Sequence, residues 1–545
     1  MDNVTVVISQ NRGWKSLQKG NRTLHFKGFL TSHSIESLQD ILFDSNSDWD
    51  IKNILTSLDG NFAFILESST KAIFSVDRLS STPVIYTEIN GKFYITDSAE
   101  ILLPWMKDFV KDKDSLQCLL MSGYTIGNKT VLNSLKTLNP GEGCVIDTSG
   151  ARRINYFKFN GVPLDLRSEK SKLLIDLRVV TIKIFKKLIE SVNGRQIVIP
   201  LSAGYDSRLV ASCLRDLNYK NVVCFSYGTP GNFEAKVAKK IARKLGYRWH
   251  FVPMTHMSEK AFLKSQDFKE YEKFSDSYNA IPYFQGLSSV KFLKENELIK
   301  DDAVFVNGNS GDFISGGHIQ TFEAGRDNDC SKKNRMCHIV KKQIDKHYSL
   351  WGSEKTLHNV SKLSSMLILE LECLGYTLGS VDEDYMLYEA LEFHNRQSKY
   401  VIAGQKTFDF YGYDWRLPLW DKDYLDFWAK VPLNFKLDQA LYKEMLFKSD
   451  FGDVWGELFP LNHKTISPSW VIPIRKLTQI PFFFFGKKGK SYWHKIEVCL
   501  FYYFMDDTHM MDYVGYLRGL RATFKFPRHH GSWQVLDYIS KKVKG

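Results

Sequence analysis

The first 160 residues alternate short apolar segments with turn residues. Each segment is a few residues long and rich in β-branched or aromatic side chains, as in 23–30, 61–67, 71–76, 84–88 and 92–96. Segments of this kind, bounded by turn residues, predict β-strands. We therefore expect residues 1–165 to form an antiparallel β-rich domain.

The pattern changes near residue 165, where we place a domain boundary. Apolar residues then recur at spacings of one, three and four over 168–192, which predicts a long helix. Fully apolar segments at 197–201, 222–226 and 303–306 alternate with helical patterns at 207–217 and 232–245. This alternation is typical of a parallel sheet buried on both faces. The expected fold class is α/β, with a doubly wound parallel-sheet domain over 166–450 that is largely helical from about residue 335.

The segment after residue 450 has no clear pattern, and we expect 451–545 to be an extension packed on the preceding domain. Its most apolar window, 480–485, is far shorter than the roughly 20 residues that span a bilayer. A basic stretch, 486–490, follows directly. We expect the window to be a buried core strand; a membrane or partner contact is the alternative.

Composition and charge narrow the class of protein. The 545 residues contain 73 Lys and Arg against 61 Asp and Glu, a net charge of +12, which favours anionic ligands. The eight cysteines form no CxxC pair, so neither a disulfide framework nor a zinc ribbon is indicated. The N-terminus lacks the apolar core of a signal peptide. We expect a soluble, cytoplasmic protein without a transmembrane segment.

Two Gly-rich turns follow apolar strands, at 201–207 and 308–317. Ligands of doubly wound sheets bind at the carboxyl ends of the strands, where a turn that opens a helix offers free backbone N–H groups to an anion. Each turn also contains an aspartate, Asp206 and Asp312. Carboxylates suit a phosphate site when Mg2+ lies between them and the phosphate oxygens. The alternative for Asp206 is a helix cap. Neither turn has the GxxxxGK[ST] pattern, which disfavours a P-loop enzyme.

Several segments in the same order resemble one family. Residues 202–207 resemble the SGGxDS pyrophosphate loop of the asparagine synthase family, 225–228 its adenine-contacting strand and 308–317 its GEGADE segment. Residues 414–421 and 443–446 are similar to its ExRxPFLD and KxxLR segments. The segments 58–64, 77–86, 98–100 and 138–141 resemble its N-terminal glutaminase-type domain.

The resemblance implies an organisation into three parts. Residues 1–165 would be a degenerate glutamine amidotransferase-like domain of the N-terminal-nucleophile type, and 166–450 an asparagine synthase-like ATP pyrophosphatase domain, with 451–545 as the extension. It also implies an AMP-forming ligase: a carboxylate attacks ATP, pyrophosphate leaves, and ammonia or a substrate amine displaces AMP from the acyl-adenylate. ATP is a substrate and Mg2+ a cofactor.

The resemblance assigns roles to individual residues. Lys443 would be catalytic together with Asp206 and Asp312, which would also bind Mg2+. The alternative for Lys443 is a solvated helix lysine. The residues expected to bind ATP and pyrophosphate are Leu201, Ser202, Ala203, Gly204, Tyr205, Asp206, Ser207, Ser226 and Gly308.

Some positions depart from the family pattern. Glutamine-hydrolysing members have a cysteine after the initiator methionine, whose thiol is the nucleophile and whose amino group is the base. Asp2 stands there, and we expect no glutaminase activity. Ala203, Asn309 and Phe313 replace a glycine and two acids, which leaves the acceptor acid unidentified.

Two other functions stay open. One is a non-catalytic scaffold that retains both domains. The other is an RNA-modifying ATP pyrophosphatase, suggested by the net charge and the basic C-terminal end. Sulfur-transferring members need a cysteine near the acceptor, and the only cysteines beside the loops, Cys213 and Cys224, are expected in a buried helix face and a strand. The expected partners are a small carboxylate and ammonia or an amine. We do not expect nucleic acid, and a homodimer is left open.

Overall fold

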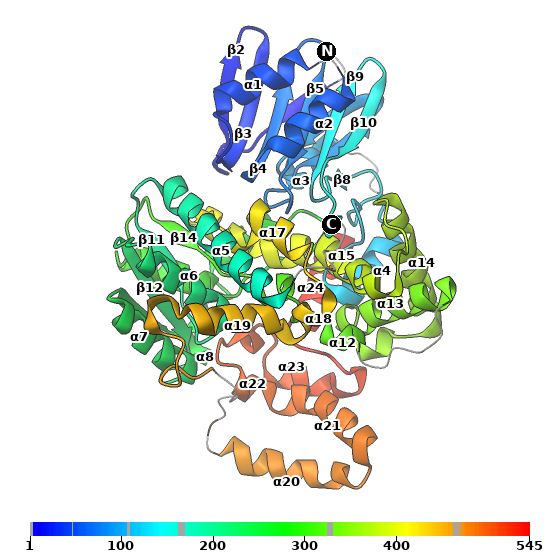
Figure 1. Ribbon diagram of the computed structural model, residues 1–545. Helices are drawn as coiled ribbons and strands as arrows, with labels where there is room; N and C mark the ends of the chain where they lie inside the picture. The colour runs from blue at the N-terminus through cyan, green and yellow to red at the C-terminus, as the bar shows by residue number, and fades with distance from the viewer. Residues whose placement is uncertain are drawn as a thin grey trace.

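The computed structural model of the chain describes residues 4–544 except 46, 106–109, 162–168, 324–330, 462–467 and 469. Strands in this part of the chain form three sheets, and the mixed α/β class expected from the sequence is confirmed (Figure 1). The expected boundary near residue 165 lies outside the described residues, as does Asp2.

The larger N-terminal sheet is antiparallel throughout, in the order β10-β9-β5-β4-β3-β2. Side chains of β4 alternate between its two faces. Phe62 and Phe64 pack against two helices, whereas Ala63 packs against the second sheet. The elements are β2 Lys15–Lys19, β3 Arg22–Leu30, α1 Ile35–Asp44, α2 Asp48–Ser57, β4 Gly60–Glu67, β5 Ala72–Val76, β9 Glu142–Asp147 and β10 Gly150–Asn155.

The second N-terminal sheet has the order β1-β7-β6-β8. Its pairs are antiparallel except for β1 and β7, which run parallel, so the antiparallel prediction is wrong for this pair. The long stretch of chain between the two strands permits the crossover that a parallel pair needs. The strands are β1 Val4–Val7, β6 Ile85–Ile89, β7 Lys92–Thr96 and β8 Lys136–Thr137.

The third sheet is parallel in every pair, in the order β13-β12-β11-β14-β15. The predicted strands and helices are confirmed to within a few residues as α5 Lys170–Val192, β11 Ile197–Pro200, α6 Tyr205–Asp216, β12 Val222–Gly228, α7 Phe233–Leu245 and β14 Val304–Val306. The outer strands β13 (Arg248–Pro253) and β15 (Asp414–Arg416) were not predicted.

The chain after β14 is largely helical, as expected, with β15 as the exception among the described residues. The principal helices between β13 and residue 450 are α8 His256–Phe262, α9 Gln266–Ser275, α10 Leu287–Glu295, α11 Gly311–Ile314, α13 Lys332–His347, α14 Leu357–Cys373, α15 Asp384–Glu392, α17 Lys422–Trp428 and α19 Ala440–Ser449.

A lysine of α5 joins the N-terminal sheets to the parallel-sheet domain. The Nζ atom of Lys187 lies 2.8 Å from Oδ2 of Asp59 and 3.2 Å from Oδ1 of Asp421. Beside this junction, the guanidinium of Arg416 lies 3.7 Å from the ring centroid of Phe29 and donates to the Ser191 carbonyl. The two domains therefore meet through charged and cation–π contacts as well as apolar packing.

The last helix of the extension, α24 (Gly531–Lys544), packs against α4 (Lys113–Ser122). Trp533 shares an apolar cluster with Leu119. The amide of Gln534 donates to the Pro282 carbonyl at 2.6 Å, and the Tyr538 hydroxyl donates to Oδ1 of Asp276 at 2.6 Å. The end of the chain thus belongs to a core shared with residues of both preceding domains.

The window 480–485 is not a buried strand, and that prediction is wrong. It lies at the end of helix α20 (Val471–Phe483) and in the turn before α21 (Gly486–Leu500). Phe484 and Phe485 are 85% and 72% exposed. The helix packs mainly against α21, so most of its apolar surface meets no neighbour. No helix in the described part of the chain has both the length and the apolar character to cross a bilayer.

The buried indole of Trp533 predicts how much α24 contributes to stability. We expect Trp533→Ala to lower the free energy of unfolding by about 3–5 kcal/mol, because it removes a large side chain from a closed cluster. Urea denaturation measures this change. Leu517→Ala, at a position 66% exposed, is the control and should change stability by under about 0.5 kcal/mol. Similar values for the two variants would contradict this role of α24.

Candidate functional site

A cavity of about 780 Å³ opens at the carboxyl ends of β11, β12 and β14. Its size is within the usual range for small-molecule sites. The two Gly-rich turns form part of its wall. The rest comes from β12, the start of α7, the segments 283–290 and 404–408, Gln439 and the C-terminal extension. The parallel sheet therefore places the ligand site where doubly wound folds usually have it.

The first turn, 201–207, is held by its own serines. Ser202 and Ser207 are linked through their hydroxyls at 2.9 Å, and Ser202 accepts from the Gly204 amide at 3.1 Å. The Ser226 hydroxyl of β12 donates to the Leu201 carbonyl at 2.7 Å and fixes the turn to the next strand. Gly204 is the N-cap of α6, so the first turn of this helix directs unpaired N–H groups toward the cavity.

The second turn lies directly against the first. A Cβ atom on Gly308 would come within 2.7–2.9 Å of the backbone of Asp206 and Ser207. Asp206 and Ser207 belong to α6, and Gly308 follows β14, so neither segment can move without disturbing its helix or strand. Only glycine therefore fits at position 308. This close approach brings Asp206 and Asp312 to the same side of the cavity.

Asp206 and Asp312 differ in their surroundings. Asp206 accepts from the backbone amide of Asp312 at 3.1 Å and from the Tyr442 hydroxyl at 2.9 Å. Desolvation and the neighbouring charge of Asp312 raise the pKa of Asp206 to about 7. The side chain of Asp312 is 55% exposed to the cavity. Desolvation alone would raise its pKa, but the hydrogen bond and the charge of His318, together with the backbone amide of Phe313, lower the pKa overall.

His318 joins Asp312 to a buried acid behind the site. Its Nε2 lies 3.3 Å from Oδ2 of Asp312, and its Nδ1 lies 2.6 Å from Oε1 of Glu392, which is fully buried. His347 and Lys346 contact the other oxygen of Glu392 at 2.7 and 3.3 Å. Burial disfavours charge on His318, but Glu392 and Asp312 outweigh it and raise its pKa to about 9. His318 is thus an imidazolium at neutral pH, and sequence reasoning missed it because no pattern marks a single histidine after two glycines.

The C-terminal extension completes the cavity wall. Asp506, Asp507 and Thr508 are part of its lining. The carbonyl of Asp507 accepts from the Thr229 amide at 2.8 Å, which docks the segment on the end of β12. Burial and the charge of Asp506 raise the pKa of Asp507 to about 6. Sequence reasoning gave the extension no part in the site, because contacts between distant segments leave no local pattern.

The charged residues that line the cavity are all acidic. Among the described residues, the lining contains no Lys or Arg, but it contains five acids: Asp206, Glu234, Asp312, Asp506 and Asp507. Burial is the main cause of the raised pKa values of Asp206 and Asp507, and the charge of a neighbouring aspartate adds to it in each case. Carboxylate oxygens on one side of an open cavity fit a hard divalent cation such as Mg2+, with Asp206 and Asp312 as the candidate ligands.

Most of the predicted site residues meet at the cavity; Ala203 of the ATP-binding set and the catalytic candidate Lys443 do not. Those in the lining are Leu201, Ser202, Gly204, Tyr205, Asp206, Ser207, Ser226, Gly308 and Asp312. Ala203 is buried in the core and is not in the lining. Lys443 is half-buried on α19 and is also outside the lining, whereas Gln439 of the adjoining turn and Tyr442 reach the site. The role of Lys443 stays a prediction.

The departures from the family pattern have a structural explanation. Phe313 does not face the cavity: its ring packs on Phe159 and Trp420 in the core, at centroid distances of 5.7 and 6.0 Å. Asn309 stays in the lining as an uncharged residue. Replacing the acid at 313 therefore removes one charge without leaving a buried, unpaired group.

Two protein families match the chain. Residues 190–449 match the asparagine synthase family, and residues 31–157 match the glutamine amidotransferase domain. The first range contains both Gly-rich turns, and the second covers most of the N-terminal sheets. The asparagine synthase match supports an ATP pyrophosphatase-type amide ligase in general terms. None of the curated proteins compared matches the chain.

Solved structures resemble the chain only weakly. One is the allosteric regulatory enzyme of purine biosynthesis, with 13% identity, 43% of this chain covered and a TM-score of 0.19. Another is the glutamine phosphoribosylpyrophosphate amidotransferase from B. subtilis in complex with ADP and GMP, with 12% identity, 53% covered and a TM-score of 0.18. The matches span 61% and 62% of those chains.

The elevated pKa of His318 predicts a pH-dependent contribution to stability. Because its folded pKa of about 9 exceeds the ordinary 6.5, protonated His318 stabilises the fold below pH 6.5, and this contribution is lost as the pH rises through 9. Chemical denaturation of wild type and His318→Gln measures it. The stability difference should shrink by up to about 3 kcal/mol between pH 6.5 and 9.5.

The matched control is His358→Gln, at an exposed position. Its difference from wild type should stay constant over the same pH range. A constant difference for His318→Gln as well would contradict the ion-pair network.

Proposed function

Because the chain belongs to the asparagine synthase family, we propose that it is an AMP-forming ligase. It would activate a substrate carboxylate as an acyl-adenylate, release pyrophosphate and form an amide with ammonia or a substrate amine. The observation that carries the proposal is the cavity at the strand ends, which combines the open N-terminus of α6 with two adjacent aspartates. This combination suits a nucleotide polyphosphate bound with a divalent cation.

The first turn would bind the departing pyrophosphate. The amides at the start of α6 and the hydroxyls of Ser202 and Ser207 are donors on the side of the cavity where β11 ends. The internal bonds of the turn fix these donors before the ligand arrives, which reduces the reorganisation needed when charge moves onto the leaving group.

Asp206 and Asp312 would hold Mg2+, which when bound neutralises phosphate charge and polarises the reacting phosphoryl group. His318 positions Asp312 by a direct bond, and Tyr442 does the same for Asp206. The nucleoside end would lie along β12, where Phe225, Ser226 and Tyr227 line the cavity.

Lys443 is the proposed cation for the crowded phosphorus centre. It lies one residue after Tyr442 on α19 and does not line the cavity. Its flexible four-carbon side chain ends in a compact positive charge. The proposal requires this side chain to turn toward the cavity when the nucleotide binds.

The nitrogen would come from ammonia or from the substrate, not from glutamine. Glutamine hydrolysis needs a reactive thiol. Cys118 and Cys144 of the N-terminal part are buried, and burial raises the pKa of each to about 12. Buried thiols of this kind are poor nucleophiles. The N-terminal sheets would therefore act as a scaffold.

A non-catalytic scaffold is the second candidate, and the absence of Lys and Arg from the described lining favours it. An RNA-thiolating enzyme is disfavoured. Cys213 and Cys224, the cysteines after the first loop, are buried, and burial raises the pKa of both.

The ligase proposal predicts AMP and pyrophosphate formation from ATP and Mg2+ with one member of a carboxylic-acid panel, using ammonia but not glutamine. Asp206→Asn should lower the rate at least 10²-fold, by removing a charge that stabilises the transition state. Gly456→Ala, on open surface, is the control and should leave the rate unchanged.

Two outcomes separate the candidates. ATP binding without AMP formation, even with the panel widened to sugar acids and amino acids, would favour the scaffold. Absence of ATP binding would refute the ligase and the RNA-thiolating enzyme, because both reactions need ATP.

A further inference from the structure

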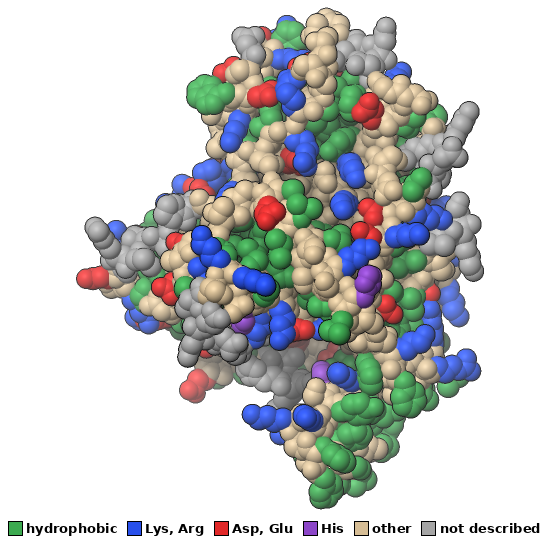
Figure 2. All heavy atoms as spheres, turned by 90° about the vertical axis from the view of Figure 1, so that its right-hand side faces the viewer, with side chains coloured by type: hydrophobic (Ala, Val, Ile, Leu, Met, Phe, Trp, Pro, Cys, Tyr) green, Lys and Arg blue, Asp and Glu red, His purple; other side chains and the backbone are tan. Residues whose placement is uncertain are grey.

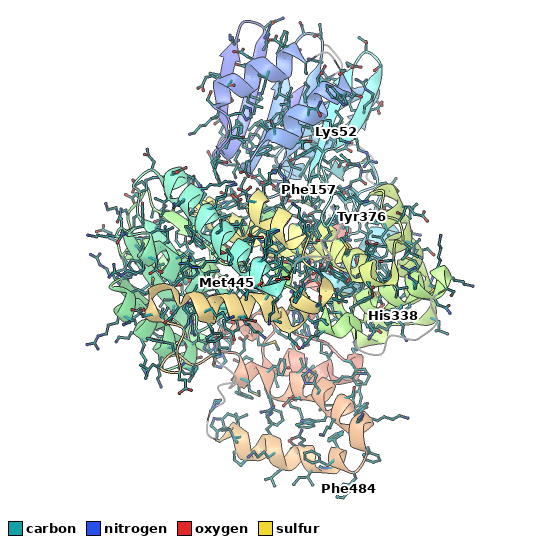
Figure 3. The ribbon with its side chains drawn as sticks, in the orientation of Figure 1. Lys52, Phe157, His338, Tyr376, Met445 and Phe484 are labelled. Carbon is teal, nitrogen blue, oxygen red and sulfur yellow. The ribbon has the colours of Figure 1, made fainter. Side chains whose placement is uncertain are left out.

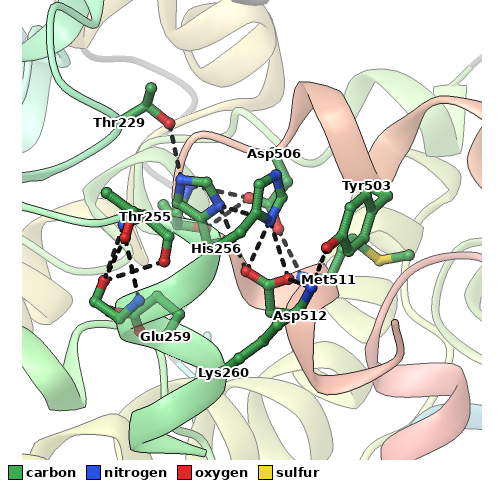
Figure 4. Close-up of polar contacts among 12 residues, drawn as sticks. Thr229, Thr255, His256, Glu259, Lys260, Tyr503, Asp506, Met511 and Asp512 are labelled. Atoms are coloured by element: carbon green, nitrogen blue, oxygen red, sulfur yellow. Dashed lines mark hydrogen bonds and ion pairs between the residues drawn. The ribbon is translucent and has the colours of Figure 1, made fainter. Parts of the chain in front are cut away.

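Two observations outside the nucleotide cavity point to further binding sites. The first is a cluster formed by His256 at the start of α8 with His509 and Asp512 of the extension (Figure 4). The Nδ1 atoms of His256 and His509 are 3.2 Å apart. Oδ2 of Asp512 lies 2.9 Å from the first nitrogen and 3.5 Å from the second.

These three separations fit a shared metal ion. The two Nδ1 atoms and Oδ2 of Asp512 lie on a circle of about 1.9 Å radius. A single ion about 1 Å above the plane of that circle would be about 2.1 Å from each of the three atoms, which is a typical length for Zn–N and Zn–O bonds. Two imidazole nitrogens that face each other at 3.2 Å cannot both carry a proton. A cation satisfies both lone pairs and the carboxylate at once.

The outer contacts also suit metal ligands. Nε2 of His509 lies 3.1 Å from the Thr229 hydroxyl, which favours the tautomer with the proton on Nε2 and the lone pair on Nδ1. The carboxylate of Asp512 is fully buried and needs compensating charge. Lys260 lies 3.7 Å from its other oxygen, Oδ1, and leaves Oδ2 for the ion.

We propose that His256, His509 and Asp512 bind one Zn2+, which holds the 506–512 segment against α8. The adjacent residues Asp506, Asp507 and Thr508 line the nucleotide cavity, so the ion would stabilise that wall. The alternative is a metal-free cluster in which His256 donates to Asp512.

Metal analysis of the untagged protein after dialysis with Zn2+ tests this site. We expect one Zn2+ per chain in wild type and in His358→Ala, a control at an exposed histidine. His256→Gln should bind Zn2+ at least 10-fold more weakly. Its circular dichroism spectrum should match wild type, because the change is local. Equal zinc in wild type and a folded His256→Gln variant, or none in either, would overturn the proposal.

The second observation is the hairpin of α20 and α21, which projects from the end of the molecule opposite the N-terminal sheets (Figures 1 and 3). Val471 and Trp493 pack in its small inner cluster. Phe484 lies at its tip (Figure 3). Its exposed apolar side chains are Trp470, Ile472, Ile474, Leu477, Ile480, Phe483, Phe484, Phe485 and Tyr492.

These side chains make a continuous apolar surface at the lower end of the molecule in Figure 2. Soluble proteins rarely expose apolar patches of this extent unless the patch binds something. The patch is concentrated on a convex hairpin rather than in a groove, which suits insertion into a surface layer.

The charged residues near the tip of the hairpin are all positive. Between Glu457 and Glu497 the sequence contains no Asp or Glu. Lys487, Lys488 and Lys490 are exposed directly after the aromatic tip. Aromatic side chains beside lysines match the boundary between acyl chains and anionic headgroups of a bilayer. Helices of 13 and 15 residues are too short to span the roughly 30 Å hydrocarbon core, so they would lie in the interface.

We propose that the 470–495 hairpin docks the enzyme on an anionic lipid surface. Phe484 and Phe485 would enter the acyl boundary, and the adjacent lysines would contact the headgroups. The site would then work at a membrane surface, on a substrate that is itself at or near the lipid.

Co-sedimentation with vesicles of phosphatidylcholine, with or without 30% phosphatidylglycerol, tests the hairpin. We expect binding to the anionic vesicles that weakens at high salt. Phe484→Ser with Phe485→Ser should reduce binding at least 10-fold. Leu357→Ser, at a position 92% exposed on α14, should bind like wild type.

Two results would overturn the proposal. One is equal sedimentation of the hairpin variant and wild type. The other is absence of binding to either kind of vesicle. If analytical ultracentrifugation then shows a dimer that the two serine substitutions abolish, the patch is a contact between two copies of the chain instead.

Discussion

The concentration of negative charge in the cavity at the strand ends is the constraint on which the rest of the site depends. Carboxylates from three distant parts of the chain converge there without a lysine or arginine in the described lining. Desolvation raises the pKa of Asp206, and the neighbouring charge of Asp312 raises it further. In the proposed function a polyphosphate would add to this repulsion, and a divalent cation would make nucleotide binding compatible with the acidic wall.

The surrounding fold holds this unfavourable arrangement together. Gly308 allows the two turns to touch, and His318 on buried Glu392 fixes Asp312 from behind. The 506–508 segment closes the other side through its bond to Thr229. The same extension contains α24, which is embedded in the shared core, and two of the three proposed zinc ligands. Regions far apart in sequence therefore support one cavity, and the extension is an integral part of it.

The local pattern of the chain predicted much of the fold and the part of the cavity wall formed by the two Gly-rich turns, but not the rest of that wall. Apolar strands, the 201–207 turn and Asp312 were identified because each is defined by neighbouring residues. His318, Glu234 and the 506–508 segment were missed because only tertiary contacts bring them to the site. The exposed hairpin was taken for core because apolar content predicts burial only where a partner element covers it, and α21 covers one side alone. Lys443 was placed by resemblance, and its side chain does not line the cavity.

Titration calorimetry of ATP binding, with Mg2+ and with excess EDTA, tests the central claim most directly. The account predicts binding in Mg2+ that weakens at least 10²-fold in EDTA, because the acidic wall then repels the free polyphosphate. Asp312→Asn should reduce the dependence on Mg2+. Equal affinity in Mg2+ and EDTA would contradict the claim that a cation reconciles the nucleotide with the carboxylates.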